Sequence, residues 1–420
     1  MFGALRSSDY RVLLACLSVY SVGLWTYRFG LGWLVVQIAI ADGSTDRAPL
    51  YLGAVGFATA VPGMCLSLIA GAVVDRFDLR RILVACQVCG IALSVTLAWL
   101  TAIGSVSLWA VLVLVMGMSA VSTFDDTVKN TLVMRIVPRE TTGSAIGLDS
   151  MRFNATQAVG PALGGLLLTS VGLPAVLLAE GAGYLALTGI VLFTRPPGLV
   201  TNRQQPLLAS VLDGLRYVRD DRLLRSVVLL GVAIAFFTRP SLALLPAFVE
   251  DVLGGGASHL AGLMSAVGVG SFIGAVVLGA IGVGRRPGLL FIASMCLTGA
   301  TLAVFAVQRE FSAALAGAVV LGMGTLFLNG LQNAILQIES DARMLGRVIG
   351  IAVLLFYGVI PLGQLALGAL GSAVGIQTSF VVGGAVTFAG GVYAFARVRS
   401  VRDLELERAI GAARPIEGSS

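Results

Sequence analysis

Long apolar stretches alternate with short polar segments along the whole chain. A membrane-spanning helix needs about 20 mostly apolar residues, and twelve stretches meet this requirement. They cover residues 12–40, 51–74, 82–102, 106–128, 144–169, 174–194, 224–249, 259–282, 289–307, 311–337, 346–372 and 376–396. The pattern predicts an all-α integral membrane protein with twelve transmembrane helices.

The longest polar interruption separates six stretches from six. Within it, apolar residues recur at helical spacing from Leu208 to Val218, which predicts an amphipathic helix along the inner membrane face. We therefore expect two pseudo-symmetric six-helix bundles joined by a cytoplasmic linker. The expected units are an N-terminal bundle at 1–194, the linker at 195–223, a C-terminal bundle at 224–397 and a cytoplasmic tail at 398–420.

Composition excludes a water-soluble protein. Apolar residues make up 57% of the chain and charged residues only 12%, about half of the usual charged share of soluble proteins. The net charge of +6 does not predict nucleic-acid binding, because the basic residues alternate with apolar spans instead of lining one face. The five cysteines lie inside apolar stretches, so we expect neither disulfides nor a bound metal.

Arginine placement predicts the orientation in the membrane. If the amino terminus is cytoplasmic, the outer loops hold only Arg47 and Arg309, while nearly all other basic residues outside the spans fall on the cytoplasmic side. Because cytoplasmic loops carry the excess of lysine and arginine, both termini are expected to be cytoplasmic. The preference for arginine, alanine and glycine suggests a bacterial source, and therefore a bacterial inner membrane.

The two halves resemble each other in sequence. STFDDTVKN (122–130) aligns with TLFLNGLQN (325–333), which pairs Asp126 with Asn329. A second alignment pairs Arg28 with Arg239. Internal repeats of this kind are typical of secondary transporters, whose substrate site lies near the membrane midplane between the repeats.

The loop after the second stretch, GAVVDRFDLRRIL (71–83), contains Gly71, Asp75, Arg76 and Arg80. On physical grounds alone, it is a tight loop whose basic residues face the inner leaflet. The same residues resemble the loop signature of the major facilitator superfamily, although Asp78 and Leu79 depart from it. The resemblance implies that Asp75 acts as a conformational latch on the cytoplasmic side.

The fifth stretch contains Gly147, Gly160, Pro161, Gly164 and Gly165. The simpler interpretation is a kinked helix that packs closely against its neighbours. The spacing also resembles the fifth-helix motif of drug/proton antiporters, with Thr156 in place of one glycine. Together with segments such as LPAFVEDVLGGGAS, it indicates the branch that contains the enterobactin exporter and macrolide-efflux proteins. This resemblance implies alternating access of a central site.

Arg28 and Arg239 are charged residues within predicted spans, where each costs about 2.5–3.5 kcal/mol on insertion scales. Two interpretations remain open. Both arginines could face one central chamber and hold an anionic substrate, or each could pair with a carboxylate or carbonyl group of its own half.

Four carboxylates within spans are candidates for proton coupling: Asp126, Asp125, Glu180 and Asp149. Asp126 is favoured because its counterpart in the other half is also polar, although it could equally be a solvated charge at the cytoplasmic rim. Asp149 is expected to pair locally with Arg152, three residues later. Glu180 ranks lower because the sixth helix is usually peripheral in this superfamily.

The tenth stretch has a polar stripe that includes Asn329, Gln332 and Asn333. The stripe could join helices or form part of a substrate-contacting wall. Tyr27 and Phe237 could add aromatic surface for an amphipathic substrate, or they could simply pack.

No cofactor and no catalytic residues are expected. Lys129 is the only lysine and no glycine run precedes it, so a phosphate-binding loop for ATP is absent. The predicted function is secondary active transport: proton-coupled efflux of a small amphipathic, anionic compound by a monomer. A lysophospholipid flippase, a solute importer and an integral-membrane enzyme are alternatives.

Overall fold

A computed structural model describes residues 8–136, 142–193, 207–341 and 344–404, and every regular element in these ranges is helical. The first part of the expected linker and most of the expected tail lie outside the described residues. The elements are α1 (Ser8–Ala41), η2 (Thr45–Arg47), α2 (Ala48–Arg76), α3 (Leu79–Ala102), α4 (Leu108–Ile136), α5 (Thr142–Ser170), α6 (Leu173–Phe193), α7 (Leu207–Asp220), α8 (Arg222–Phe237), α9 (Arg239–Ala243), α10 (Leu245–Asp251), α11 (Ala257–Ile281), α12 (Pro287–Ala306), α13 (Phe311–Glu339), α14 (Leu345–Val374), α15 (Ile376–Arg397) and α16 (Arg399–Arg402).

The predicted apolar stretches correspond to helices, and ten stretches of described helix are long and apolar enough to cross a membrane. Local signals set several helix ends. Asp78 and Asp221 cap α3 and α8 by accepting hydrogen bonds from backbone N–H groups at 2.7 and 2.8 Å. Gly375 has a φ of 95°, a conformation that glycine adopts easily, and it separates α14 from α15. The predicted all-α membrane class is confirmed.

The prediction of one continuous seventh helix over 224–249 is wrong. The structure divides this stretch into α8, α9 and α10, with Pro240 and Pro246 in the first turns of the two short helices. Proline removes a backbone donor and disfavours helical geometry in the residue before it. The break places Arg239 at the start of α9.

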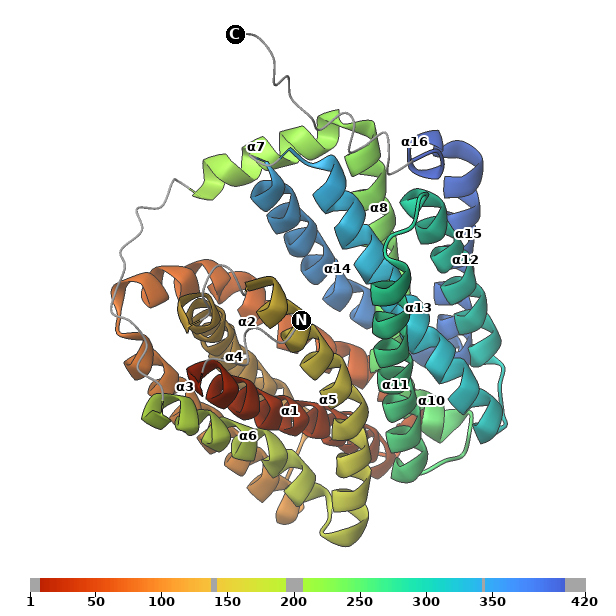
Figure 1. The fold of residues 1–420 in the computed structure, drawn as a ribbon. Coiled ribbons are helices and arrows are strands. Elements are labelled where there is room, and N and C mark those ends of the chain that lie inside the picture. The colour runs from red at the N-terminus through yellow and green to blue at the C-terminus, as the bar shows by residue number, and fades with distance from the viewer. Residues whose placement is uncertain (1–7, 137–141, 194–206, 342–343, 405–420) are drawn as a thin grey trace.

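The helices form two groups, α1–α6 and α8–α15, which meet along α2 with α14 and α5 with α11 (Figure 1). Glycines allow close contact there. A Cβ atom on Gly165 would lie 2.6 Å from Ala261 Cβ, and one on Gly268 would collide with the backbone of Ala158. The N–H of Leu50 at the start of α2 also donates a 3.0 Å hydrogen bond to Ser372 Oγ of α14.

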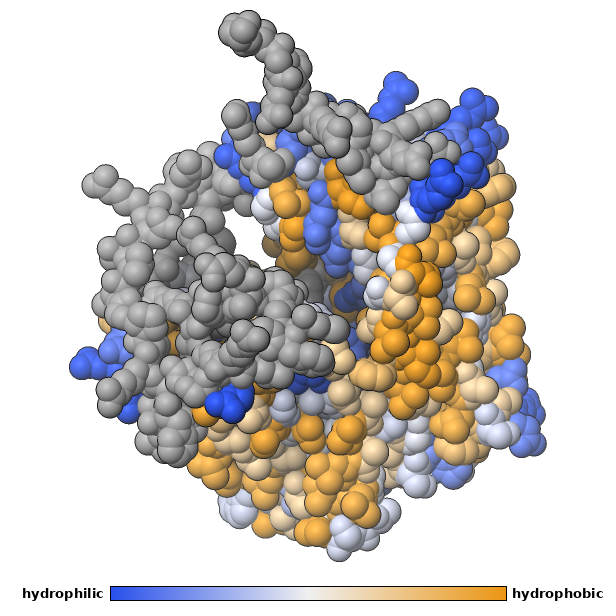
Figure 2. Space-filling view, in the orientation of Figure 1, coloured by the Kyte–Doolittle hydropathy of each residue, from blue (hydrophilic) through white to orange (hydrophobic). Residues whose placement is uncertain are grey.

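Toward the opposite ends of the same four helices, the groups separate. At four glycines in these parts of the helices, an added Cβ atom would have no neighbouring atom within 4 Å: Gly71, Gly147, Gly279 and Gly350. Figure 1 shows the two groups diverging toward α7, and Figure 2 shows the resulting hollow with hydrophilic residues on the visible part of its wall. The molecule therefore has a cleft that is closed at one end and open at the other.

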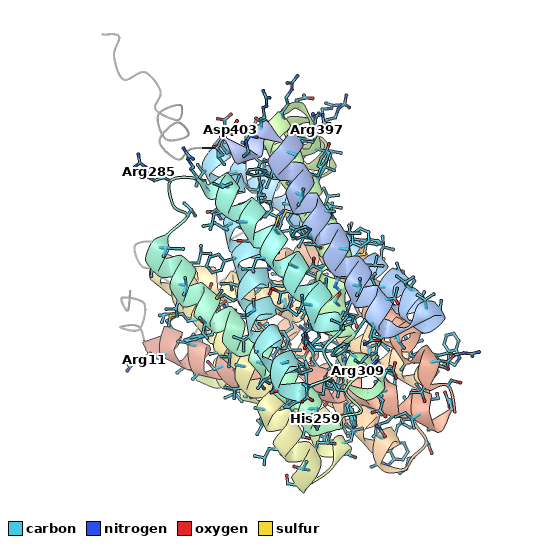
Figure 3. The ribbon with its side chains drawn as sticks, turned by 90° about the vertical axis from the view of Figure 1, so that its right-hand side faces the viewer. Arg11, His259, Arg285, Arg309, Arg397 and Asp403 are labelled. Carbon is cyan, nitrogen blue, oxygen red and sulfur yellow. The ribbon has the colours of Figure 1, made fainter. Side chains whose placement is uncertain are left out.

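Charge differs between the two ends. The open end carries the arginines of the α2–α3 turn, the α7–α8 segment and α16. Figure 3 shows Arg285, Arg397 and Asp403 at one end, and His259 and Arg309 at the other. Because the cleft opens at the arginine-rich end, the positive-inside rule identifies that end as the expected cytoplasmic side.

Candidate substrate and proton site

Arg28 is exposed on α1. Its guanidinium lies 4.9 Å from the ring centroid of Trp25, and that ring meets Phe153 of α5 edge-on at 5.8 Å. Gly32, one turn further along the same face, contacts Pro246 of α10 in the other group. Arg28 therefore projects between the two groups of helices, one helical turn away from the contact that closes this end. This position agrees with the interpretation in which Arg28 faces a central chamber.

Arg239 lies on the other side of that contact, seven residues before Pro246. Its guanidinium donates a hydrogen bond to Asn329 Oδ1 of α13, and Asn329 Nδ2 donates to Thr325 O at 2.8 Å. The structure thus brings together two residues that were predicted separately as site residues. It also shows that Arg239 has a partner in its own half, as the simpler interpretation expected.

A charged cluster on α4 contains two of the predicted carboxylates. Lys129 Nζ lies 2.8 Å from both Asp125 Oδ2 and Asp126 Oδ1, and 3.9 Å from the ring centroid of Tyr20 on α1. The side chain of Asp125 is 0% exposed and that of Asp126 is 63% exposed. Lys129 was not predicted as a site residue, although its spacing of three and four residues from the two aspartates is typical of such pairs.

Glu180 of α6 is buried, with 3% exposure. Its Oε2 atom has no hydrogen-bond partner among the described residues, and its charged neighbours include Arg28 and Lys129. The structure therefore places Glu180 beside the charged residues of the cleft wall instead of at an isolated peripheral position.

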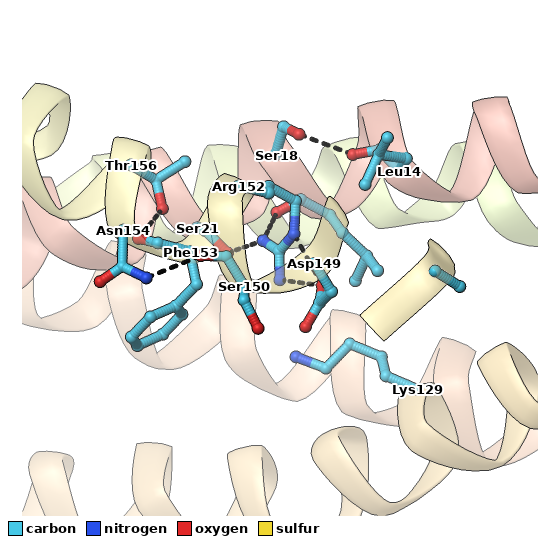
Figure 4. Close-up of polar contacts among 12 residues, drawn as sticks. Leu14, Ser18, Ser21, Lys129, Asp149, Ser150, Arg152, Phe153, Asn154 and Thr156 are labelled. Carbon is cyan, nitrogen blue, oxygen red and sulfur yellow. Dashed lines mark hydrogen bonds and ion pairs between the residues drawn. The ribbon is translucent and has the colours of Figure 1, made fainter. Parts of the chain in front are cut away.

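The predicted pair of Asp149 and Arg152 is confirmed, with a closest N–O distance of 2.7 Å. Arg152 also donates to Leu17 O at 2.8 Å and to the hydroxyl of Ser21. Figure 4 shows this network between α5 and α1, with Lys129 of α4 beside it. Because Asp149 is neutralised by a residue that joins two helices, its contacts are those of a structural ion pair.

Other predicted substrate contacts have different surroundings. Gln332 is buried and donates to Val227 O of α8 at 3.1 Å, so it joins helices. Tyr27 is also buried. Asn333 is exposed on the same helix as Asn329, and Phe237 is half-buried against Phe236, with ring centroids 4.8 Å apart.

The fifth-helix motif mediates close packing between helices. A Cβ atom at Gly160 would meet Trp25, and one at Gly164 would lie 2.5 Å from Phe29 Cδ1. Thr26 Oγ1 donates to Gly160 O at 2.9 Å. Gly165 faces α11, the buried Pro161 lies between these contacts, and Gly147 faces open space.

The loop motif lies at the open end. Gly71 and Arg76 belong to the last turns of α2, and Arg80 belongs to the first turn of α3. The backbone of Asp75 is helical, but its side chain lies outside the described part of the structure. The latch therefore stays a prediction.

The closed end has a further inter-group contact and an acidic group. The side chain of Gln364 on α14 occupies the space beside Gly56 of α2. Partial burial, followed by the nearby carboxylates of Glu250 and Asp46, raises the pKa of Asp251 on α10 to about 6. Asp46 belongs to the segment between α1 and α2, so carboxylates of both groups meet at this end.

Two groups of helices around a central cleft are the fold of major facilitator superfamily transporters. The chain belongs to the transmembrane secretion effector family of this superfamily, whose model matches residues 1–413.

Known relatives and solved structures agree with this assignment. The chain is 26% identical over 399 residues to the multidrug efflux pump Tap of Mycobacterium tuberculosis, covering 91% of this chain and 92% of the pump. It is 22% identical over 357 residues to macrolide efflux protein A of Streptococcus pyogenes, covering 83% and 88%. An inward-facing, unoccupied bacterial homologue of the human lysosomal transporter Spinster shares the fold, with a TM-score of 0.72, 15% identity and coverage of 98% and 99%. The structure of a D-xylose–proton symporter gives a TM-score of 0.71 at 14% identity, covering 94% and 99%.

Proposed function

We propose that this protein exports a small amphipathic compound with an anionic group across the bacterial cytoplasmic membrane, in exchange for protons. The two helix groups rock about the cleft, which exposes it to one side at a time. Both termini are cytoplasmic in this proposal, and the present conformation is open to the cytoplasm.

The observation that supports the proposal best is the position of Arg28. A guanidinium group exposed in a cleft between membrane helices is costly, and Arg28 contacts the ring of Trp25 without a direct ion pair to a carboxylate among the described residues. An anionic group on a substrate would neutralise it, while Trp25 and Phe153 would contact the apolar part of the same molecule.

Proton coupling rests on the carboxylates around the cleft. Asp126 is 63% exposed, and Glu180 is buried near the same cluster of charges. Without an ATP-binding loop, an ion gradient is the available source of energy. The efflux activity named for the relatives Tap and macrolide efflux protein A supports this direction of transport.

Efflux from cells that lack their other pumps tests the proposal. A panel of amphipathic compounds would be loaded into such cells, and their release would be followed at two external pH values. Faster release at the lower pH, only in cells that produce the protein, is expected. Movement of a labelled lysophospholipid without any pH dependence would instead support a flippase.

A further inference from the structure

Asp126 lies on α4, in the same group of helices as Arg28, and its side chain is 63% exposed. Gly117 of α4 faces α3, where an added Cβ would lie 3.3 Å from Leu93 Cδ1. Asp126 follows nine residues later, about two and a half helical turns, and therefore points away from α3. With Asp125 directed toward Tyr20 of α1 through Lys129, the exposed carboxylate of Asp126 opens into the space between the groups.

The two cleft-facing charges have opposite signs, and neither is fully neutralised. Asp125 and Asp126 share one ammonium group, that of Lys129, so this cluster has a net charge of one negative unit when both carboxyl groups are ionised. Arg28 contacts an aromatic ring and forms no carboxylate ion pair among the described residues. The wall is thus positive at Arg28 and negative at Asp126.

The separation of these charges along the cleft follows from helix geometry. Tyr20 of α1 lies at the level of Lys129 of α4. Arg28 is eight residues further toward the closed end, and Asp126 is three residues from Lys129 in the same direction. At 1.5 Å per residue, Arg28 and Asp126 differ in height by about 8 Å. Trp25, beside Arg28, provides an aromatic surface together with the partly exposed Phe153.

We propose that the cleft binds a zwitterionic aromatic amphiphile. Its anionic group pairs with Arg28, its cationic group pairs with Asp126, and its ring contacts Trp25 and Phe153. The cationic group takes the place of Lys129 at Asp126, while Lys129 keeps its ion pair with Asp125. This inference rests on the proposed export function and specifies its substrate class.

Three related probes test the inference: 4-(2-aminoethyl)benzoate, its methyl ester and its N-acetyl derivative. The first is a zwitterion, the second keeps only the positive charge, and the third keeps only the negative charge. Binding of each to the purified full chain in detergent would be measured by titration calorimetry. We expect the zwitterion to bind at least tenfold more tightly than either derivative.

Variants assign each charge to its partner. Arg28→Gln should abolish the preference for the zwitterion over the ester and leave the affinity for the ester unchanged. Asp126→Asn should abolish the preference over the N-acetyl derivative and leave the affinity for that derivative unchanged. Arg309→Gln and Asp42→Asn, at exposed positions of the closed end, are the matched controls and should bind all three probes as the parent chain does.

The inference is overturned if the zwitterion does not bind more tightly than both derivatives, including the case in which none of the three binds. It is also overturned if either variant weakens all probes equally. If the expected binding pattern is found but no proton-coupled efflux occurs, the proposed function fails and the inference stands. If coupled efflux occurs with singly charged compounds and no preference for the zwitterion, the inference alone fails.

Discussion

Lys129 forms an ion pair with Asp125 inside the first group of helices, with 2.8 Å between Nζ and Oδ2. The aspartate side chain is 0% exposed, so its ionised form depends on this one ammonium group. Removing one member of a buried ion pair leaves an uncompensated charge and costs about 3–5 kcal/mol. The stability of the first group of helices therefore depends on the same lysine that balances the charge of Asp126.

Lys129→Met should strongly destabilise the protein, because Asp125 loses its counter-charge. The second substitution Asp125→Asn should restore most of the stability by removing the remaining charge. Thermal unfolding of the purified variants in detergent checks both statements. If Lys129→Met alone is as stable as the parent chain, the ion pair does not contribute to stability.

Gly164→Leu should destabilise the contact between α1 and α5. The added side chain would enter the space of Phe29, and overpacking of this kind costs about 1–3 kcal/mol. Gly147→Leu is the matched control on the same helix, since that position faces open space. Equal unfolding temperatures for the two variants would contradict the packing role of the motif.

Ser372→Ala should favour opening of the closed end, because the hydrogen bond from Leu50 to Ser372 joins the two groups only when they meet there. Loss of one such bond is worth about 1 kcal/mol, or roughly a fivefold change in the ratio of the two states. Spin labels at Ser105 and Arg309, in a chain without native cysteines, would report the distance across this end.

Two variants control for this measurement. Ser372→Thr keeps the hydroxyl group and should behave as the parent chain does. Ser170→Ala removes a hydroxyl group that bonds only within its own helix and should also have no effect. The same distance distribution in all variants would show that the bond does not hold the end closed.

Asp251→Asn should stabilise the protein above pH 6. The folded state raises the pKa of this carboxyl group to about 6, so folding favours the protonated form and stability decreases as the pH rises from about 4 through 6. The gain at pH 7.5 should be about 1 kcal/mol or less, because solvent screens the neighbouring charges. Unfolding temperatures of the variant and the parent chain should converge near pH 4, and a constant difference at every pH would refute this explanation.

The sequence predicted the membrane class because span length and apolar composition are local properties. The break in the seventh span was also encoded locally, by Pro240 and Pro246, but its residues are apolar enough to resemble one continuous helix. The spacing of Asp149 and Arg152 was sufficient to predict their ion pair. The contacts of Arg152 with Leu17 and Ser21 were not predictable, since they depend on how α1 packs against α5.

The candidate site shows the same limit. Arg28, Arg239 and Asn329 could be selected as polar residues within apolar stretches. The hydrogen bond between Arg239 and Asn329, and the role of Gln332 in joining α13 to α8, depend on contacts between distant segments. The spacing of Lys129 from its two aspartates could be read from the sequence, but its position over the Tyr20 ring depends on how α4 packs against α1.

The most direct test of proton-coupled export follows the internal pH of proteoliposomes. Vesicles that contain the purified protein would be loaded with a transported compound and a trapped pH-sensitive dye, and release of the compound would then be started by dilution. Exchange predicts that the interior becomes more acidic as the compound leaves. Release with no change of internal pH, or with a rise of internal pH, would contradict the account.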